Sequence, residues 1–143
     1  MEKIIVILVT IVATLITVAS ALPGTATMYT KYVPSACFGT EPKGDLVARV
    51  NDALWQNYTN CDTMIKVTCT GSKFGNPCTN QSVAVKVVDH CVGPKCPTLV
   101  LSKQAFTQIA NPAAPMIQID YRQLSWYNDI LIINIRHSPS IKF

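Results

Sequence analysis

The sequence predicts an all-β fold, a small closed β-barrel with one or two short helices. Four stretches rich in β-branched residues alternate apolar and polar side chains, as half-buried strands do. Clusters of Pro, Gly, Asn and Ser separate these stretches and are typical of turns. Six cysteines in a chain of 143 residues indicate cross-links, which would supplement the modest core that such a small domain can bury.

The alternation shows which side chains of each strand share a face. The four stretches are residues 25–29, 64–69, 83–88 and 117–121. In the first, Thr25, Thr27 and Tyr29 share one face, and the other three place mostly Val and Ile on a common face. We therefore expect a sheet with one apolar side, which a barrel would enclose.

Two short helices are predicted between the strands. Asn51 is suited to cap a helix over residues 52–56, and Ser102 to cap one over residues 103–110. Pro112 would end the second helix, because proline lacks the backbone N–H that a helix needs.

The first 21 residues have the layout of a secretory signal peptide. A start that contains Lys3 precedes an uncharged, largely apolar run, and Ala19-Ser20-Ala21 provides a small-x-small cleavage pattern. A retained signal anchor is the alternative, but the 15 residues of run 4–18 are short for a membrane span, which needs about 20. We expect cleavage after Ala21, secretion, and no stable membrane insertion of the mature protein.

Cysteine content and charge narrow the functional classes. The even number of cysteines in a secreted chain predicts three disulfides, for which 15 pairings are possible. A zinc site at His90, Cys91 and Cys96 is disfavoured, because adjacent His-Cys is not a standard ligand spacing. The net charge of +4 without a Lys/Arg cluster argues against nucleic-acid binding. Two sequons predict N-glycosylation at Asn57 and Asn80.

A set of motifs in fixed order resembles the expansin-like EG45 domain proteins of plants, which include the plant natriuretic peptides. The motifs are Gly24-Thr25-Ala26-Thr27, Pro34-Ser35-Ala36-Cys37-Phe38-Gly39, Asp52-Ala53-Leu54-Trp55, Val67-Thr68-Cys69-Thr70-Gly71, Asp89-His90-Cys91, Leu101-Ser102 and Ile119-Asp120-Tyr121-Arg122. The resemblance implies a domain over residues 22–124 with a six-stranded double-psi β-barrel. It also implies an extracellular location, in the apoplast or cell wall.

The resemblance further implies the disulfides Cys37–Cys61, Cys69–Cys78 and Cys91–Cys96. Two of these pairs bracket short Gly/Pro loops, so the pairing suits the sequence as well.

An enzyme of this barrel class would need two carboxylates that flank a glycosidic bond. Val100 occupies a position where the family commonly has Asp, and valine cannot protonate a leaving group. Asp89 remains, but we favour the interpretation that its carboxylate accepts N–H bonds of the following turn. Asp120 is expected to be a surface residue that pairs with Arg122 or Lys86. We therefore predict a non-enzyme with no catalytic residues, metal or cofactor.

Binding is the remaining function, with Tyr29, Tyr32 and Asp89 as the candidate groove. Aromatic faces stack on sugar rings, which makes the two tyrosines candidates. Trp55 and Phe38 are expected in the core instead, and His90 in an exposed loop.

The resemblance implies that the protein is an extracellular signal in water and ion balance, which acts on a cell-surface receptor. A polysaccharide-binding or wall-loosening module is the alternative, and a cryptic endoglucanase using Asp89 or Asp120 is a third reading. We expect a monomer.

Two departures from the family pattern have structural consequences. Asn57-Tyr58 and Cys61-Asp62 stand where relatives tend to have Asn-Gly and Cys-Gly, which is harmless only where the backbone does not need a positive φ. Residues 125–143 extend beyond the usual end of the family and include the apolar run Asp-Ile-Leu-Ile-Ile-Asn-Ile. That extension would add an edge strand or remain poorly anchored.

Overall fold

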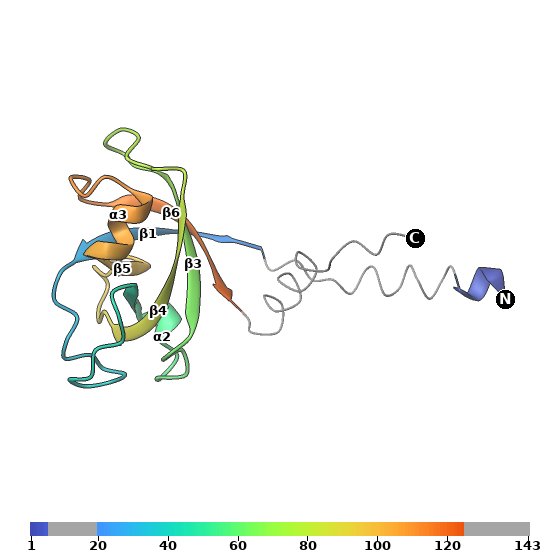
Figure 1. Ribbon diagram of the computed structural model, residues 1–143, viewed down its shortest axis with the longest axis horizontal. Helices are drawn as coiled ribbons and strands as arrows, with labels where there is room; N and C mark the ends of the chain where they lie inside the picture. The colour runs from blue at the N-terminus through green and yellow to red at the C-terminus, as the bar shows by residue number, and fades with distance from the viewer. Residues whose placement is uncertain (6–19, 125–143) are drawn as a thin grey trace, which may run out of the picture.

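A computed structural model of the protein describes residues 1–5 and 20–124 (Figure 1). The predictions for the apolar run of the signal peptide and for the C-terminal extension fall outside these residues. In the part that is described, no helix has the length and apolar character that crossing a membrane requires.

Six strands and two short helices make up the domain. In chain order they are β1 (Leu22–Tyr29), β2 (Val47–Val50), α2 (Asp52–Trp55), β3 (Met64–Gly71), β4 (Ser82–His90), β5 (Leu99–Ser102), α3 (Lys103–Ile109) and β6 (Ile117–Leu124). The four predicted strands and both predicted helices are confirmed.

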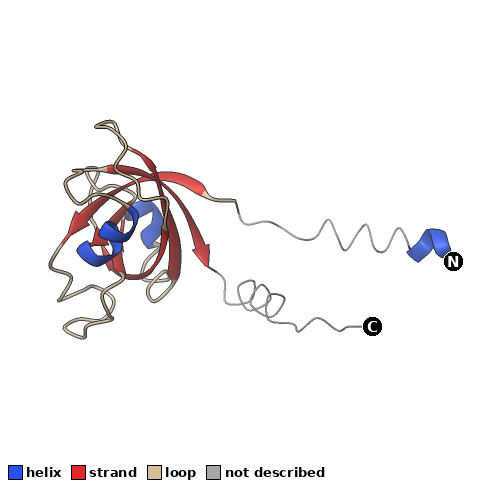
Figure 2. Cartoon of the chain, turned by 45° about the horizontal axis from the view of Figure 1, so that its top comes forward, coloured by secondary structure: helices blue, strands red, loops and turns tan. Residues whose placement is uncertain are grey.

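The strands, drawn as red arrows in Figure 2, close into a barrel. Their order around it is β1-β5-β2-β4-β3-β6. The pairs β1/β5 and β2/β4 are parallel, and the other four pairs are antiparallel. The predicted closed six-stranded barrel is therefore confirmed. Closure gives each of these six strands a partner on both sides, which protects the sheet from edge-to-edge association.

The barrel encloses one apolar core. Its fully buried members include Phe106 and Ile109 of α3, Leu99 and Leu101 of β5, and Ile117 of β6. Because the helix α3 contributes two of these side chains, it closes one part of the barrel instead of lying loosely on it.

Both helices begin where the sequence indicates. Asn51 Oδ1 accepts a hydrogen bond from Leu54 N at 3.1 Å, and Ser102 Oγ accepts one from Ala105 N at 3.3 Å. These side chains satisfy donors that the first turn of a helix leaves unpaired. The first helix ends at Trp55, with Gln56 in a left-handed conformation.

The three disulfides pair as the resemblance implied: Cys37–Cys61, Cys69–Cys78 and Cys91–Cys96. Their Cα atoms lie 5.7, 5.4 and 5.8 Å apart, which is normal for a disulfide. Because all six cysteines of the sequence are paired in this way, none is left for metal binding or nucleophilic chemistry.

The two departures from glycine both carry a conformational cost. Tyr58 and Asp62 each have φ +67°, in the left-handed region where a side chain is disfavoured. The condition under which these substitutions would be harmless is therefore not met. Gln56 and Asn57, at φ +47° and +50°, extend the same left-handed turn.

Candidate functional site

A β-bulge places Asp89 on the outer face of the barrel. Ala48 pairs with Val87, but the next residue, Arg49, pairs with Asp89, so that Val88 is an extra residue in β4. Without the bulge, the alternation of β4 would put Asp89 on the same side as the core residue Val87. The insertion reverses this and sets Asp89 beside Arg49.

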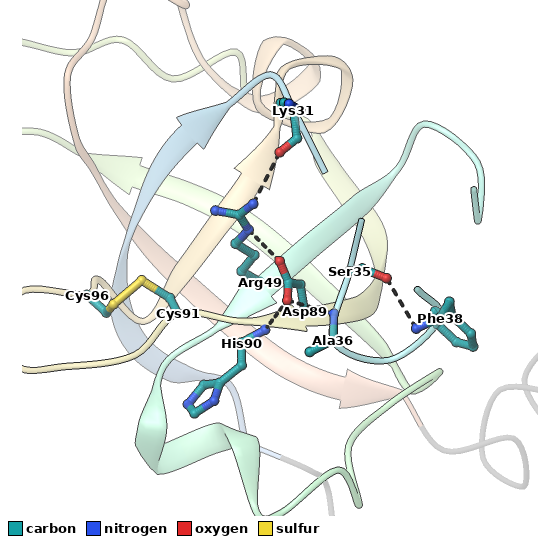
Figure 3. Close-up of polar contacts among 9 residues, drawn as sticks. All are labelled: Lys31, Ser35, Ala36, Phe38, Arg49, Asp89, His90, Cys91 and Cys96. Atoms are coloured by element: carbon teal, nitrogen blue, oxygen red, sulfur yellow. Dashed lines mark hydrogen bonds and ion pairs between the residues drawn. A yellow bond between two sulfur atoms is a disulfide. The ribbon is translucent and has the colours of Figure 1, made fainter. Parts of the chain in front are cut away.

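The Asp89 carboxylate is held by two backbone N–H donors and by the guanidinium of Arg49 (Figure 3). Its Oδ1 accepts hydrogen bonds from Ala36 N and His90 N, each at 2.9 Å. Its Oδ2 lies 2.7 Å from Arg49 Nε, and the two groups form an ion pair. The Nε–H group is not directed at Oδ2 and makes no hydrogen bond. Because Asp89 is only 9% exposed, these contacts offset the cost of burying its charge.

Arg49 connects Asp89 to the end of β1. Its Nη2 donates to the backbone oxygen of Lys31 at 3.1 Å, and its Cζ lies 4.4 Å from the centre of the Tyr29 ring. A guanidinium over an aromatic face is a favourable cation–π arrangement. Across the β2/β5 ladder Arg49 faces Val100, which is 8% exposed and lies outside the core cluster.

Two tyrosines complete the cluster. The rings of Tyr29 and Tyr32 meet edge to face, with centroids 5.9 Å apart. Tyr32 Oη donates to Asp45 Oδ1 at 3.2 Å, whereas the buried Tyr29 Oη has no hydrogen-bond partner among the described residues. Burial raises the pKa of Tyr29 strongly, an effect that the nearby Arg49 charge partly opposes. Desolvation and then the Asp45 carboxylate raise the pKa of Tyr32.

We call these residues, Tyr29, Tyr32, Arg49, Asp89 and Val100, the outer-face cluster. The structure brings the three predicted groove residues Tyr29, Tyr32 and Asp89 together. Asp89 accepts backbone N–H bonds, as expected, but they come from His90, the last residue of β4, and from the distant Ala36, and not from the turn that follows the strand. Arg49 was missed, because β2 has only four residues and three of them are buried, so no alternation revealed an outward arginine.

Of the two aromatic residues that were expected in the core, only one lies there. Trp55 is 7% exposed and belongs to the core cluster, as predicted. Phe38 is partly exposed and does not belong to it, and the Lys43 ammonium lies 4.6 Å from the centre of its ring. The placement of Phe38 in the core is therefore wrong, because the loop that follows Cys37 runs over the surface of the barrel.

His90 is not the exposed loop histidine that the sequence suggested. It ends β4, its ring stacks on Trp55 with centroids 4.5 Å apart and planes 5° apart, and its Nε2 lies 2.7 Å from Asp52 Oδ1. Asp52 Oδ2 also accepts from Gly93 N at 3.2 Å. The Asp52 carboxylate therefore ties helix α2 to the loop closed by Cys91–Cys96.

Asp120 is exposed on β6, as predicted, but neither expected ion pair forms. Lys86 pairs instead with Asp62 at 3.1 Å, and no contact within 4 Å joins Asp120 to Arg122.

The described residues contain no group of three or more His, Cys, Asp or Glu side chains that could hold a metal ion. The predicted glycosylation sites Asn57 and Asn80 are both exposed and lie in turns with positive φ.

The mixed, closed six-stranded barrel belongs to the expansin-like double-psi class. The expansin of Clavibacter michiganensis superposes with a TM-score of 0.61 at 24% identity, over 75% of this chain and 52% of that one. A point mutant of the same expansin, in complex with cellohexaose, superposes with a TM-score of 0.58 at 26% identity, over 74% and 51%. This chain therefore spans about half the length of the expansin. A family model described as lytic transglycolase matches residues 47–121.

Sequence relatives define the family. The chain is 44% identical to the putative EG45-like domain containing protein 1 of Arabidopsis thaliana, over 85% of this chain and 98% of that protein. It is 41% identical to the EG45-like domain containing protein of Citrus jambhiri, over 85% and 95%. The chain belongs to the family of EG45-like domain containing proteins, as the resemblance indicated.

Proposed function

We propose that this protein is a non-catalytic, extracellular module that binds a cell-wall polysaccharide on its outer-face cluster. One observation carries the proposal: the carboxylate at the centre of that face, Asp89, is engaged by Arg49 and two backbone N–H groups. Val100, opposite Arg49, offers methyl groups where a glycosidase of this barrel class would need a second carboxylate.

The side chains around Asp89 are suited to hold a sugar. The Tyr29 and Tyr32 rings offer apolar surface to the C–H face of a pyranose. The guanidinium of Arg49 is a hydrogen-bond donor for sugar hydroxyls. In further support, a structurally similar expansin mutant has been crystallised with cellohexaose.

A binding experiment tests this function. Cellohexaose is titrated into the protein and into the variants Tyr32→Ala and Tyr58→Ala, with NMR chemical shifts as the readout. We expect Tyr32→Ala to weaken binding about fivefold, because a stacking ring is worth about 1 kcal/mol. Tyr58, which is 60% exposed and outside the cluster, is the matched aromatic control and should change nothing.

The non-catalytic part of the proposal has its own test. Neither the protein nor the variant Asp89→Asn should convert cellohexaose into shorter sugars. Cleavage by the protein that disappears in Asp89→Asn would make it an endoglucanase, and failure of cellohexaose to bind at all would refute polysaccharide binding.

A second candidate role is extracellular signalling in water and ion balance through a cell-surface receptor. Tyr58 and Val92 are 60% and 77% exposed. Both lie near Trp55, since the Tyr58 ring contacts Trp55 and Val92 comes two residues after His90, whose ring stacks on Trp55. A protein partner that covers this part of the surface would bury both, which supports the role. The Val92→Asp variant should abolish an ion-flux response of treated cells, and should leave cellohexaose binding intact. Secretion after cleavage at Ala21 and glycans on Asn57 and Asn80 are part of both roles, and mass spectrometry of the secreted protein tests them.

A further inference from the structure

A hollow of about 430 Å³ lies between two loops at one end of the barrel. One loop joins β3 to β4, and the other precedes β6; Figure 1 shows them in green and orange near the top. The lining residues are Thr25, Ser72, Lys73, Phe74, Pro115, Met116, Ile117 and Gln118. None of these residues belongs to the outer-face cluster.

The hollow presents an aromatic ring on a well-anchored loop. Phe74 is 74% exposed and Met116 is 41% exposed. Ser72 Oγ donates to the backbone oxygen of Met116 at 3.1 Å and accepts from Phe74 N at 3.1 Å, so it joins the two loops. The disulfide Cys69–Cys78 closes the base of the Phe74 loop. Because the backbone of the loop is fixed in this way, only the side-chain torsions of Phe74 lose freedom when its ring contacts a ligand.

The rim of the hollow is polar and uncharged except for one lysine. Within the described part of the chain, the side chains of Thr25, Lys73 and Gln118 form no hydrogen bond or ion pair. Pro115 and Met116 add exposed apolar surface, and no carboxylate lines the hollow among the described residues. An apolar floor with a few unengaged hydrogen-bonding groups suits a sugar ring, which has an apolar face and a hydroxylated edge.

The hollow and the outer-face cluster lie on the same face of β1. Thr25, Thr27 and Tyr29 alternate with the core residue Ala26, so all three point outward. Thr25 pairs with Gln118 at the hollow, and Thr27 pairs with Val100 in the cluster. Tyr29 lies four positions after Thr25 along the strand, a distance of about 13 Å.

We propose that the hollow around Phe74 is a second sugar subsite, which takes a more distant unit of the same polysaccharide chain that the outer-face cluster binds. The inference rests on the proposed function. It adds that the affinity of the protein depends on the length of the oligosaccharide, because only a long one reaches from Tyr29 past Thr25 to Phe74.

The experiment compares cellobiose with cellohexaose in NMR titrations of the whole protein. Cellohexaose should bind at least about tenfold more tightly and should shift the Met116 methyl resonance, whereas cellobiose should leave that resonance in place. Phe74→Ala should lower cellohexaose affinity about fivefold and leave cellobiose affinity unchanged, and Phe74→Trp should restore it. Val92→Ala, which truncates another exposed apolar side chain, is the matched control.

The outcomes separate the two proposals. If cellohexaose binds, depends on Tyr32, and is unaffected by Phe74→Ala, the second subsite is refuted and the proposed function stands. If neither sugar binds, both proposals fail. A length preference that falls about fivefold in Phe74→Ala, with Tyr32 dependence intact, supports both. Since Phe74 is exposed, its truncation should not change the urea unfolding midpoint, which is measured alongside.

Discussion

Arg49 and Asp89 stand side by side on the outer face of the barrel because Val88 is inserted into β4, and their side chains approach to 2.7 Å. The pair connects β2 and β4 to the loop after β1. Arg49 also donates a hydrogen bond to Lys31 O, and Asp89 also accepts one from Ala36 N. Stability and site geometry are therefore linked at this point.

We expect Arg49→Gln to lower the free energy of unfolding by about 2 kcal/mol, because it leaves the buried Asp89 carboxylate with backbone donors alone. Urea unfolding followed by tryptophan fluorescence measures the change. Lys86→Gln is the control: its partner Asp62 has a side chain that is 64% exposed, so the loss should stay within about 0.5 kcal/mol. Equal effects of the two variants would show that the Arg49 pair contributes no more than a surface pair.

A left-handed turn follows helix α2, and a glycine at its first position is expected to stabilise the protein. Gln56 is exposed and takes φ +47° as the residue after the helix, a position that favours glycine. Gln56→Gly should raise the free energy of unfolding by about 1 kcal/mol. Gln104→Gly, an exposed position inside α3, should lower it by about 1 kcal/mol, because glycine is unfavourable within a helix. Thermal unfolding of both variants checks the sign, and a loss of stability in Gln56→Gly would contradict this account of the turn.

Alternation predicted the strands that have one face in the core and one face outside. Residues 64–69 and 117–121 are of this kind, with Ile65, Val67 and Ile119 buried. It could not reveal β2 and β5, because these strands have four residues each and are buried almost throughout. The number of strands came from the family resemblance.

The same limit explains which part of the site was predicted. Alternation put Tyr29 on one face with Thr25 and Thr27, as the structure has it, and Asp89 was recognised as a residue near the end of a strand. The ion pair of Asp89 depends on a bulge between two strands distant in sequence, and no local pattern encodes that register. Likewise, His90 meets Asp52 only because β4 ends beside α2, 38 residues away in the chain.

Like charges face each other where β3 and β6 run side by side. Lys66 on β3 pairs directly with Arg122 on β6, and no acidic side chain lies within 4 Å of either among the described residues. Like charges at directly paired positions destabilise a sheet, whereas opposite charges stabilise it.

Lys66→Glu should therefore raise the free energy of unfolding by about 0.5–1 kcal/mol, as it converts a repulsive pair into an attractive one. The gain should shrink at high salt, because screening weakens exposed ion pairs. Lys103→Glu, at an exposed lysine on α3, serves as the charge-matched control. A double variant Lys66→Glu/Arg122→Gln isolates the pair: if the gain persists without Arg122, the repulsion is not its cause.

The buried hydroxyl of Tyr29 predicts how stability responds to alkaline pH. Because burial raises the pKa of Tyr29 above the value of about 10 that an unfolded tyrosine has, the unfolded chain loses this proton first. The contribution of Tyr29 to stability is thus complete below about pH 10 and declines as the pH rises further. Tyr29→Phe, which has no proton to lose, should show a shallower fall of unfolding free energy above about pH 10.

At neutral pH the Tyr29→Phe variant should be at least as stable as the parent, because the hydroxyl that it removes has no partner among the described residues. Urea unfolding at a series of pH values from about 7 to about 11 measures both effects, with Tyr58→Phe, whose side chain is exposed, as the control. A parallel fall in Tyr29→Phe and the parent would show that other groups cause the alkaline transition, and a loss of stability at neutral pH would show that the hydroxyl has a partner in solution.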